Sequence, residues 1–364
     1  MIRVDEIYDN VFTPKILEKE RQTIHYFSPF GTTDFENMKV NPLIPYRDKI
    51  LLCWDQEPYI NEIHRETNNT FIERFMVIMF RGSCDGKDQS FPFWGYNNKC
   101  EVIFLTSEKN SKEVNQLCEK FNWSQSYYFF HAWASLDWYR GYNRTFLIKD
   151  YKDRKITNTF ISPNRVVGGN RYHRVDLFRK MVEHNLIENN QISFPAQCPY
   201  SGEKIEIDGV KLPLVFEGEE ADNIPNESYK ITLWEQAKNS LLYIVTETLY
   251  EQQSLHLTEK TFKPIVMQMP FVIVGTKGSL EYLRSYGFKT FDSVWDESYD
   301  KLDNKERLDT IVNLLKTLNS LSLEEKAELQ KQIAPIVEYN FNWFYSQEFE
   351  NLLWKELTTM MKAW

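Results

Sequence analysis

Hydrophobic residues in this chain cluster into short continuous runs that alternate with amphipathic stretches. In the N-terminal part, residues 49–54, 75–80 and 101–105 form apolar runs of strand length, and residues 111–121 follow a helical pattern. Because buried strands separated by helices are typical of parallel sheets, this pattern predicts an α/β fold.

The same alternation continues in the second half of the chain. We expect helices and strands in the order strand 157–162, helix 174–185, strand 240–246, helix 258–268, strand 271–275, helix 278–286 and helix 323–338. A last amphipathic helix ends at Trp364 and repeats apolar residues at helical spacing: Phe349, Leu352, Leu353 and Leu357. Residues 199–230, rich in Gly, Glu, Asp and Pro, are expected to form a surface loop or hairpin.

Two domains are expected, because a chain of 364 residues exceeds the size at which one core usually keeps growing. The charged, turn-prone segment 149–155 marks the boundary, which gives an N-terminal domain of residues 1–155 and a C-terminal domain of residues 156–338. Residues 339–364 form a C-terminal helix that either crosses back to the N-terminal domain or closes the second domain.

Composition narrows the function classes. A formal net charge of −9 and a pI near 5.4 argue against a protein that coats nucleic acid by bulk electrostatics, although they allow a local basic groove. Five cysteines without a Cys-x-x-Cys pair indicate neither a disulfide framework nor a zinc site. The N-terminus lacks an apolar signal region, and no apolar run approaches the roughly 18 residues that span a bilayer. We therefore expect a soluble cytoplasmic protein with no membrane partner.

The segment from Leu257 to Gly275 is the most informative part of the sequence. Thr258 is a candidate N-cap, Glu259 and Lys260 open the first turn, and a buried strand follows. A lysine has the wrong charge for a helix N-terminus, where the backbone already presents positive partial charge. We therefore expect an anion there, such as a diphosphate held by the helix amides and Lys260, with Glu259 accepting from sugar hydroxyls. On the alternative interpretation, both residues are simply solvated.

A second candidate anion site follows the strand at 157–162. Gly168 and Gly169 let the backbone approach a ligand closely, and charge-assisted hydrogen bonds to phosphate are available from three arginines, Arg165, Arg171 and Arg174, of which the first two are preferred. The carboxyl end of a strand, before a helix, is where open α/β sheets bind ligands. The alternative is a solvated basic helix start.

Thr258, Glu259 and Lys260, followed by the strand at 271–275, resemble the donor-binding motif of GT-B glycosyltransferases, especially the α-1,3-fucosyltransferases. The run through 278–300 is also similar to glycosyltransferase-like proteins of large tailed phages, and the resemblance covers about residues 157–310. It implies two Rossmann-like domains that face each other across a cleft, with a nucleotide diphosphate sugar bound by the C-terminal domain. Glu247 would lie near this donor, although the Asn-Ser that follows it in the fucosyltransferases is absent here.

Candidate catalytic bases follow the strand at 49–54. Asp55 and Glu57 lie at its carboxyl end, where a partly desolvated carboxylate could take a proton from an acceptor hydroxyl. The alternative is that one of them caps the next helix.

An aromatic cluster at 131–139 supplies candidate acceptor contacts, because aromatic faces stack on sugars or flipped bases: His131, Trp133, Trp138 and Tyr139. His131 could instead be the catalytic base, and the whole stripe could simply be core.

Together these features predict a metal-independent hexosyl- or pentosyltransferase with a nucleotide sugar as co-substrate and no cofactor, because no metal-binding spacing is visible. The resemblance to phage proteins makes a hydroxymethylated pyrimidine in duplex DNA a candidate acceptor, in the host cytoplasm if the protein is of phage origin. Five arginines could line a DNA-facing groove: Arg65, Arg74, Arg81, Arg140 and Arg144. A glycan, lipid or protein acceptor remains an alternative, as does a non-catalytic nucleotide-binding protein on the same fold.

Overall fold

The computed structural model describes residues 7–12, 22–26, 49–59, 101–142, 150–216 and 229–364. The chain divides into two compact units, unit 1 (Met1–Asp137 with Leu353–Trp364) and unit 2 (Trp138–Leu352). This division falls inside a helix, α4 (Phe130–Tyr139), whereas the sequence-based boundary lies after residue 155. The predicted strand at 75–80 lies outside the described residues.

Unit 1 contains a parallel sheet whose four described strands follow the order β1 (Gln22–Tyr26), β2 (Lys49–Trp54), β3 (Glu101–Thr106) and β4 (Ser124–Tyr127). The registry pairs Trp54 with Thr106, so the residues after β2 and β3 leave the sheet at the same edge. Helix α3 (Lys112–Phe121) connects β3 to β4 and begins at the N-cap Ser111, whose hydroxyl accepts from the Val114 backbone N–H. The sequence did not predict β4, because its first two residues are exposed and polar.

Aromatic side chains from both ends of the chain meet in the core of unit 1. The C-terminal helix α12 (Gln347–Met361) places Trp354 against Trp133 of α4, with ring centroids 4.8 Å apart. Trp364 donates from Nε1 to the Ser126 hydroxyl at 2.9 Å, and its ring contacts Phe12 of the short helix η1 (Ile7–Phe12).

Unit 2 contains a second parallel sheet, built from β5 (Asn158–Pro163), β6 (Gln191–Ser193), β7 (Ser240–Thr246) and β8 (Phe271–Val274) in the order β6-β5-β7-β8. The chain leaves β5 for β6 on one side and then returns to add β7 on the other side. The topological switch point therefore lies between β5 and β7. The two parallel sheets with their helices confirm the predicted α/β class.

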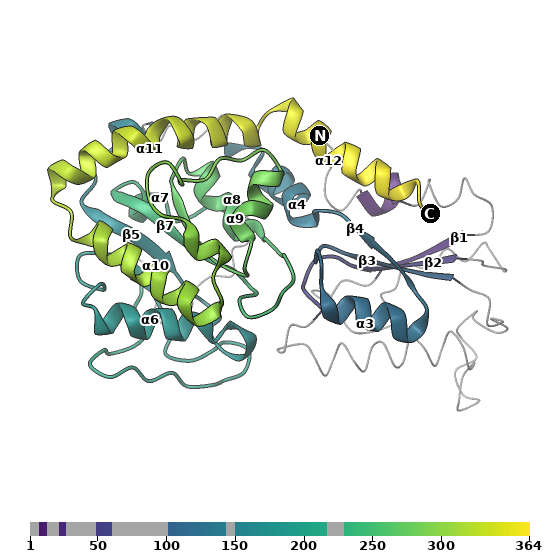
Figure 1. Cartoon of the computed structure of the whole chain (residues 1–364), viewed down its shortest axis with the longest axis horizontal. Helices are drawn as coiled ribbons and strands as arrows, with labels where there is room; N and C mark the ends of the chain where they lie inside the picture. The colour runs from purple at the N-terminus through teal and green to yellow at the C-terminus, as the bar shows by residue number, and fades with distance from the viewer. Residues whose placement is uncertain (1–6, 13–21, 27–48, 60–100, 143–149, 217–228) are drawn as a thin grey trace. The chain divides into compact units, whose positions relative to one another are not determined.

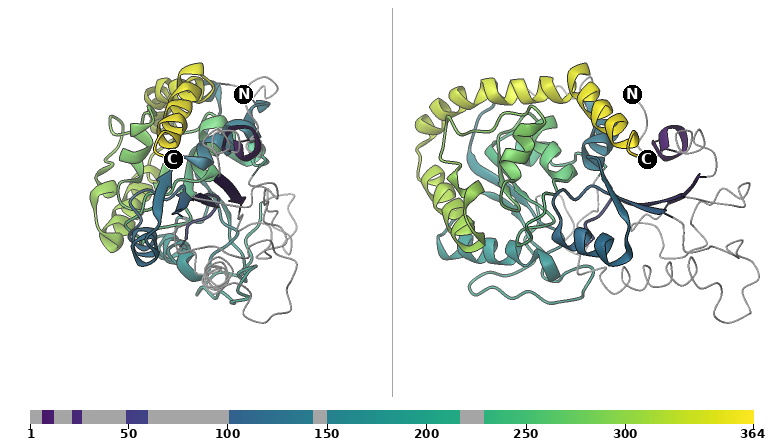
Figure 2. Two further views of the ribbon diagram at one scale, coloured as in Figure 1. Left: turned by 90° about the vertical axis from the view of Figure 1, so that its right-hand side faces the viewer. Right: turned by 45° about the vertical axis from the view of Figure 1, so that its right-hand side comes forward.

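Helices cover both faces of the unit 2 sheet (Figure 1). Helix α11 (Leu323–Phe344) lies on the opposite side of the sheet from α6 (His173–Glu183), as the right-hand view of Figure 2 also shows. The remaining helical segments of this unit are η4 (Tyr151–Asp153), η5 (Gly169–Arg171), α7 (Trp234–Ala237), α8 (Glu259–Val266), α9 (Ser279–Ser285), η6 (Ser298–Lys301) and α10 (Asn304–Asn319).

Several helices differ from the sequence prediction. Helices α4, α7 and α10 were not predicted, and α11 continues six residues beyond the expected end at Glu338, through Phe344. Residues 199–216 contain no helix and form isolated bridges such as Gln197 with Lys204, in agreement with the expected loop or hairpin.

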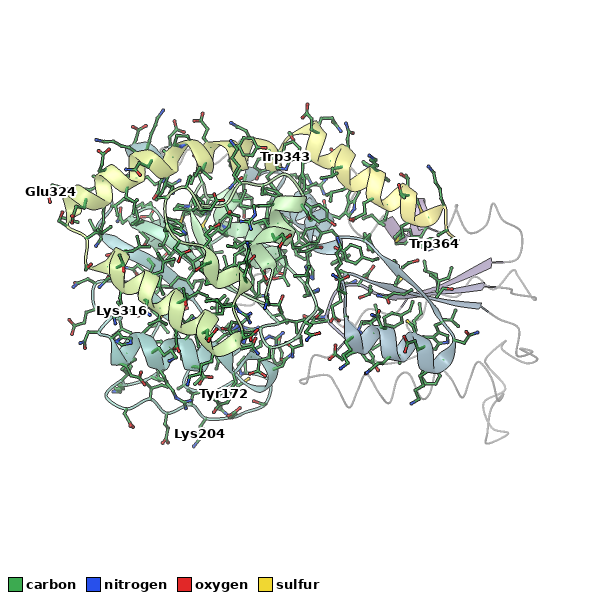
Figure 3. All side chains as sticks on the ribbon, in the orientation of Figure 1. Tyr172, Lys204, Lys316, Glu324, Trp343 and Trp364 are labelled. Atoms are coloured by element: carbon green, nitrogen blue, oxygen red, sulfur yellow. The ribbon has the colours of Figure 1, made fainter. Side chains whose placement is uncertain are left out.

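The turn after α9 packs directly under a tryptophan of α11. Gly287 has φ +87°, and a Cβ atom built there would lie 2.5 Å from Cζ2 of Trp343, whose indole N–H donates to the Tyr286 carbonyl at 2.8 Å. Figure 3 labels Trp343 on α11. Glycine is therefore required at position 287 both for its backbone conformation and for space.

We expect Gly287→Ala to lower the free energy of unfolding by about 3 kcal/mol, because left-handed strain adds to overpacking against Trp343. Gly209→Ala is the matched control, since Gly209 has φ +79° but nothing within 4 Å of a Cβ atom. The control should lose only about 1 kcal/mol in urea unfolding. Equal losses in the two variants would contradict the steric contribution of Trp343.

Candidate functional site

The switch point of unit 2 is organised by Asn164, which joins three strands. Its Oδ1 accepts from the Thr246 hydroxyl at 3.0 Å, its Nδ2 donates to the Ser162 hydroxyl at 3.2 Å, and its backbone N–H donates to the Ser193 carbonyl at 3.1 Å. These bonds fix the carboxyl ends of β5, β6 and β7 at the point where open α/β sheets bind ligands.

Glu247 follows β7 directly, and its carboxylate is buried with a residue exposure of 1%. Oε1 accepts from the Thr258 backbone N–H at 2.9 Å and from the Thr261 hydroxyl at 2.7 Å. Oε2 accepts from the Thr258 hydroxyl at 2.7 Å and from the Thr248 backbone N–H at 3.3 Å. An ionised carboxylate with two donors on each oxygen is well satisfied. Glu247 therefore ties the end of β7 to the start of α8, while its predicted contact with a donor stays a prediction.

The side chain of Lys260 makes hydrogen bonds to residues beside the start of α8. The helix begins at the predicted N-cap Thr258, and the Lys260 ammonium donates to the hydroxyls of Thr258 at 3.0 Å and Thr248 at 3.3 Å. It also lies 3.4 Å from Oε1 of Glu259, with 32% of the Lys260 side chain and 11% of the Glu259 side chain exposed. A cation reachable from solvent therefore stands at a helix N-terminus, which is suitable for an anionic ligand.

Arg174 connects the loop after β5 to the end of β7. It is buried, and it donates from Nη1 to the Val166 carbonyl at 2.7 Å and from Nη2 to the carbonyls of Thr246 and Glu247 at 2.7 and 3.0 Å. Because these bonds are made to backbone atoms, Arg174 braces the loop. Its predicted role in donor binding is not tested by these contacts.

The glycine-rich loop after β5 packs against the segment at 198–203. A Cβ atom at Gly168 would lie 2.9 Å from Oε2 of Glu203, 3.1 Å from the Ser201 hydroxyl and 3.2 Å from the Cys198 sulfur, so glycine lets the loop pack closely here. Arg165 is half-buried, and its guanidinium lies 5.7 Å from the Tyr200 ring centroid. Arg171 lies in η5 and is buried.

These contacts bring the two predicted anion sites together, although they are more than 80 residues apart in the sequence. Arg174 bonds to the backbone of Glu247, and the Glu247 carboxylate bonds to Thr258. We call residues 164–174, 247–248 and 258–260 the switch-point site. Its cations and its glycine-rich loop suit the oxygens of a phosphate or diphosphate.

In unit 1, Asp55 lies directly after β2 and is fully buried. Its Oδ2 accepts from the Tyr128 hydroxyl at 2.5 Å, and its backbone carbonyl accepts from the Ser107 hydroxyl at 2.6 Å. Glu57 is half-buried. Neither contact decides which of the two predicted carboxylates takes a proton.

A third carboxylate at this edge was not predicted. Glu108 follows β3, is fully buried, and accepts from the Tyr59 backbone N–H at 2.7 Å through Oε2. The signal that identified Asp55, an acidic residue just after a buried apolar strand, was also present here.

The aromatic cluster lies on one helix, α4, which the boundary between the two units divides. His131 and Trp133 are buried in unit 1, where Trp133 packs on Trp354, as the core interpretation requires. Trp138 is half-buried and Tyr139 fully buried, and both belong to unit 2, the unit that contains Lys260. The predicted boundary after residue 155 would instead place both residues in the N-terminal domain. Burial, and then the charge of Glu259, raises the pKa of Tyr139 well above its ordinary value.

The predicted basic groove is only partly described. Arg140 is exposed, whereas Arg65, Arg74, Arg81 and Arg144 lie outside the described residues. Within the described ranges, no group of three His, Cys, Asp or Glu side chains is placed to hold a metal ion. In the same ranges, no helix combines the length and apolar character needed to cross a membrane.

Comparisons with protein-family profiles and with curated proteins find no match. Among solved structures, the chain is similar to a point mutant of T4 phage BGT in complex with UDP-glucose, at 13% sequence identity and a TM-score of 0.36. The similarity covers 92% of this chain and 84% of that one. At this identity and TM-score, it supports no conclusion about activity.

His173 makes the switch-point site sensitive to acid. Its ring stacks on Tyr250 with centroids 4.9 Å apart, and its Nε2 lies 3.1 Å from the Glu247 carbonyl oxygen. Burial, followed by the positive charge of Arg174, holds its pKa well below the ordinary 6.5. Below pH 6.5 the unfolded chain therefore binds a proton here that the folded chain does not, so stability falls as the pH decreases.

We expect wild-type protein to lose up to about 1.4 kcal/mol of unfolding free energy per pH unit below 6.5 through His173. His173→Gln should remove this contribution in urea unfolding at pH 7, 6 and 5. His184→Gln is the control because His184 is exposed, and it should keep the wild-type slope. An unchanged slope in the His173 variant would show that this histidine is not buried in its neutral form.

The bond between Tyr128 and Asp55 should appear as a coupling free energy. Tyr128→Phe leaves the buried Oδ2 of Asp55 with one donor fewer, so we expect a coupling of about 1–3 kcal/mol with Asp55→Asn in a double-mutant cycle. Urea unfolding measures the free energy of unfolding of the wild type, the two single variants and the double variant. Additivity within about 0.5 kcal/mol would contradict the bond.

Proposed function

We propose that this chain is a metal-independent glycosyltransferase that moves a sugar from a nucleotide diphosphate sugar to an acceptor hydroxyl. The observation that carries the proposal is the solvent-reachable Lys260 ammonium at the start of α8, on the same bonded framework as the glycine-rich loop after β5. Cations at the carboxyl end of a strand stabilise a departing diphosphate through their charge and hydrogen bonds. In other active sites a bound metal ion has this role.

In this proposal, Lys260, Arg165 and Arg171 neutralise the diphosphate. Glu259 accepts from sugar hydroxyls, while Glu247 and Arg174 hold the site in shape through their bonds to backbone and threonine atoms. The acceptor hydroxyl loses its proton to a carboxylate and attacks the anomeric carbon, and the bond from that carbon to the diphosphate oxygen breaks. Asp55 and Glu57 remain the candidates for the base, joined now by Glu108.

For the acceptor, we propose a hydroxymethylated pyrimidine in duplex DNA, on the resemblance of residues 278–300 to phage proteins. The exposed Arg140 is compatible with phosphate contacts. Affinity for such a duplex should fall steeply as the salt concentration rises. Each neutralised phosphate lowers the logarithm of the binding constant by about 0.9 per log unit of salt. Transfer to a small glycan or lipid, but not to the duplex, would exclude the DNA acceptor and leave the glycosyltransferase proposal intact.

Lys260→Ala should weaken binding of a nucleoside diphosphate by about 1.5–3 kcal/mol, the scale of a hydrogen bond to a charged group. Isothermal titration calorimetry with UDP and GDP measures the loss, and Lys316→Ala, an exposed change on α10, is the charge-matched control. Equal affinity in the Lys260 variant and the control would remove Lys260 from the site.

Activity is tested with a panel of radiolabelled nucleotide sugars in the presence of EDTA. Hydrolysis or transfer of one of them supports an enzyme that needs no metal, whereas retention of the unchanged ligand indicates a binding protein. Loss of activity with EDTA that Mg²⁺ or Mn²⁺ restores would contradict metal independence.

A further inference from the structure

The loop of the switch-point site contains a buried amide whose partner is absent from the described part of the chain. Both side-chain atoms of Asn170, Oδ1 and Nδ2, are shielded from solvent and make no hydrogen bond to any described residue. Buried polar groups in native proteins are nearly always paired, and one that is not requires a specific explanation.

The position of Asn170 is set from both sides. It is the middle residue of η5, where the Arg171 N–H donates to the Gly168 carbonyl at 3.2 Å and the Tyr172 N–H to the Gly169 carbonyl at 3.2 Å. A hydrogen bond between the Asn170 backbone and the His173 imidazole also acts to raise the pKa of that histidine. Figure 3 shows Tyr172, which follows this turn, on the same side of unit 2 as Lys204. The half-buried Asn170 is therefore carried by a turn that backbone hydrogen bonds hold in place.

We propose that the Asn170 carboxamide reads the part of the donor that is not phosphate, through a group that offers a hydrogen-bond donor beside an acceptor. This inference rests on the proposed function. It assigns to Asn170 a role in specificity, separate from the charge neutralisation assigned to Lys260.

The hydrogen-bonding capacity of the carboxamide indicates which part of the donor it contacts. It presents two donors and one acceptor, whereas a phosphate offers acceptors alone and would leave Oδ1 without a partner. The cations of the site already suit the phosphates. A nucleobase edge or a pair of sugar hydroxyls satisfies both atoms of the carboxamide, and these two sources are separated by experiment.

Asn170→Ala and Asn170→Asp test the assignment, with Asn313→Ala on the exposed face of α10 as the matched control. Calorimetry is run with pyrophosphate, UDP, GDP, UDP-glucose and GDP-mannose. We expect Asn170→Ala to keep pyrophosphate affinity within twofold of wild type, while its best nucleotide ligand loses tenfold or more. Asn170→Asp keeps the shape and removes the amide donors, but its added negative charge also weakens pyrophosphate binding. Its loss for the nucleotide ligand should therefore exceed its loss for pyrophosphate by tenfold or more.

The comparison between ligands identifies the source. Equal losses for a nucleoside diphosphate and its nucleotide sugar indicate the nucleobase, and a loss confined to the nucleotide sugar indicates the sugar hydroxyls. Wild-type affinity for every ligand, or an equal loss that includes pyrophosphate, would overturn the assignment and leave the proposed function standing. Failure of the wild-type protein to bind any of the five ligands would overturn both.

Thermal unfolding of the ligand-free protein gives an independent test. Removing a buried amide that has no partner should leave the melting temperature of Asn170→Ala unchanged or higher, because the variant no longer buries an unpaired polar group. A melting temperature of Asn170→Ala clearly below that of the wild type would show that the amide is already satisfied without ligand, and would overturn the inference.

Discussion

The buried carboxylate of Glu247 is the interaction on which the switch-point site depends. Its oxygens accept four hydrogen bonds, from Thr248 and from Thr258 and Thr261 at the start of α8. The backbone carbonyl of the same residue accepts from Arg174, which also reaches the loop after β5. One residue therefore connects a strand end, a helix start and a glycine-rich loop. Such a network is rigid while every member is satisfied and costly when one is removed.

This bracing explains why the cations of the site hold defined positions. Lys260 donates to the Thr258 hydroxyl, which itself donates to the Glu247 carboxylate. Glu247 therefore fixes the position of the Lys260 ammonium indirectly, through Thr258. Ligand charge can then be met by groups that are oriented before binding, which limits the cost of ordering them. Asn164 does the same for the strands, because it fixes β5 against β6 and β7.

Local signals in the sequence predicted the framework, and long-range contacts were the part they could not supply. The apolar runs of β2 and β7 and the cap at Thr258 are encoded within a few residues, and the structure confirms them. The donors of Glu247 come from up to 14 positions away, and the Tyr128 that bonds to Asp55 is 73 positions away. The spacing of residues along the sequence does not predict such pairs. The same limit applies to Tyr139, whose proximity to Glu259 depends on the packing of unit 2.

Glu247, Asp55 and Glu108 are buried carboxylates that follow strands in the described residues, and both oxygens of Glu247 are occupied by hydrogen-bond donors. Each oxygen of Glu247 already accepts one backbone N–H and one threonine hydroxyl, so a new proton there would have to displace or reverse one of these four bonds. The four bonds make Glu247 a structural tie between β7 and α8, and its predicted contact with a donor stays a prediction. On the proposed function, Asp55, Glu57 and Glu108 are the candidates for the base.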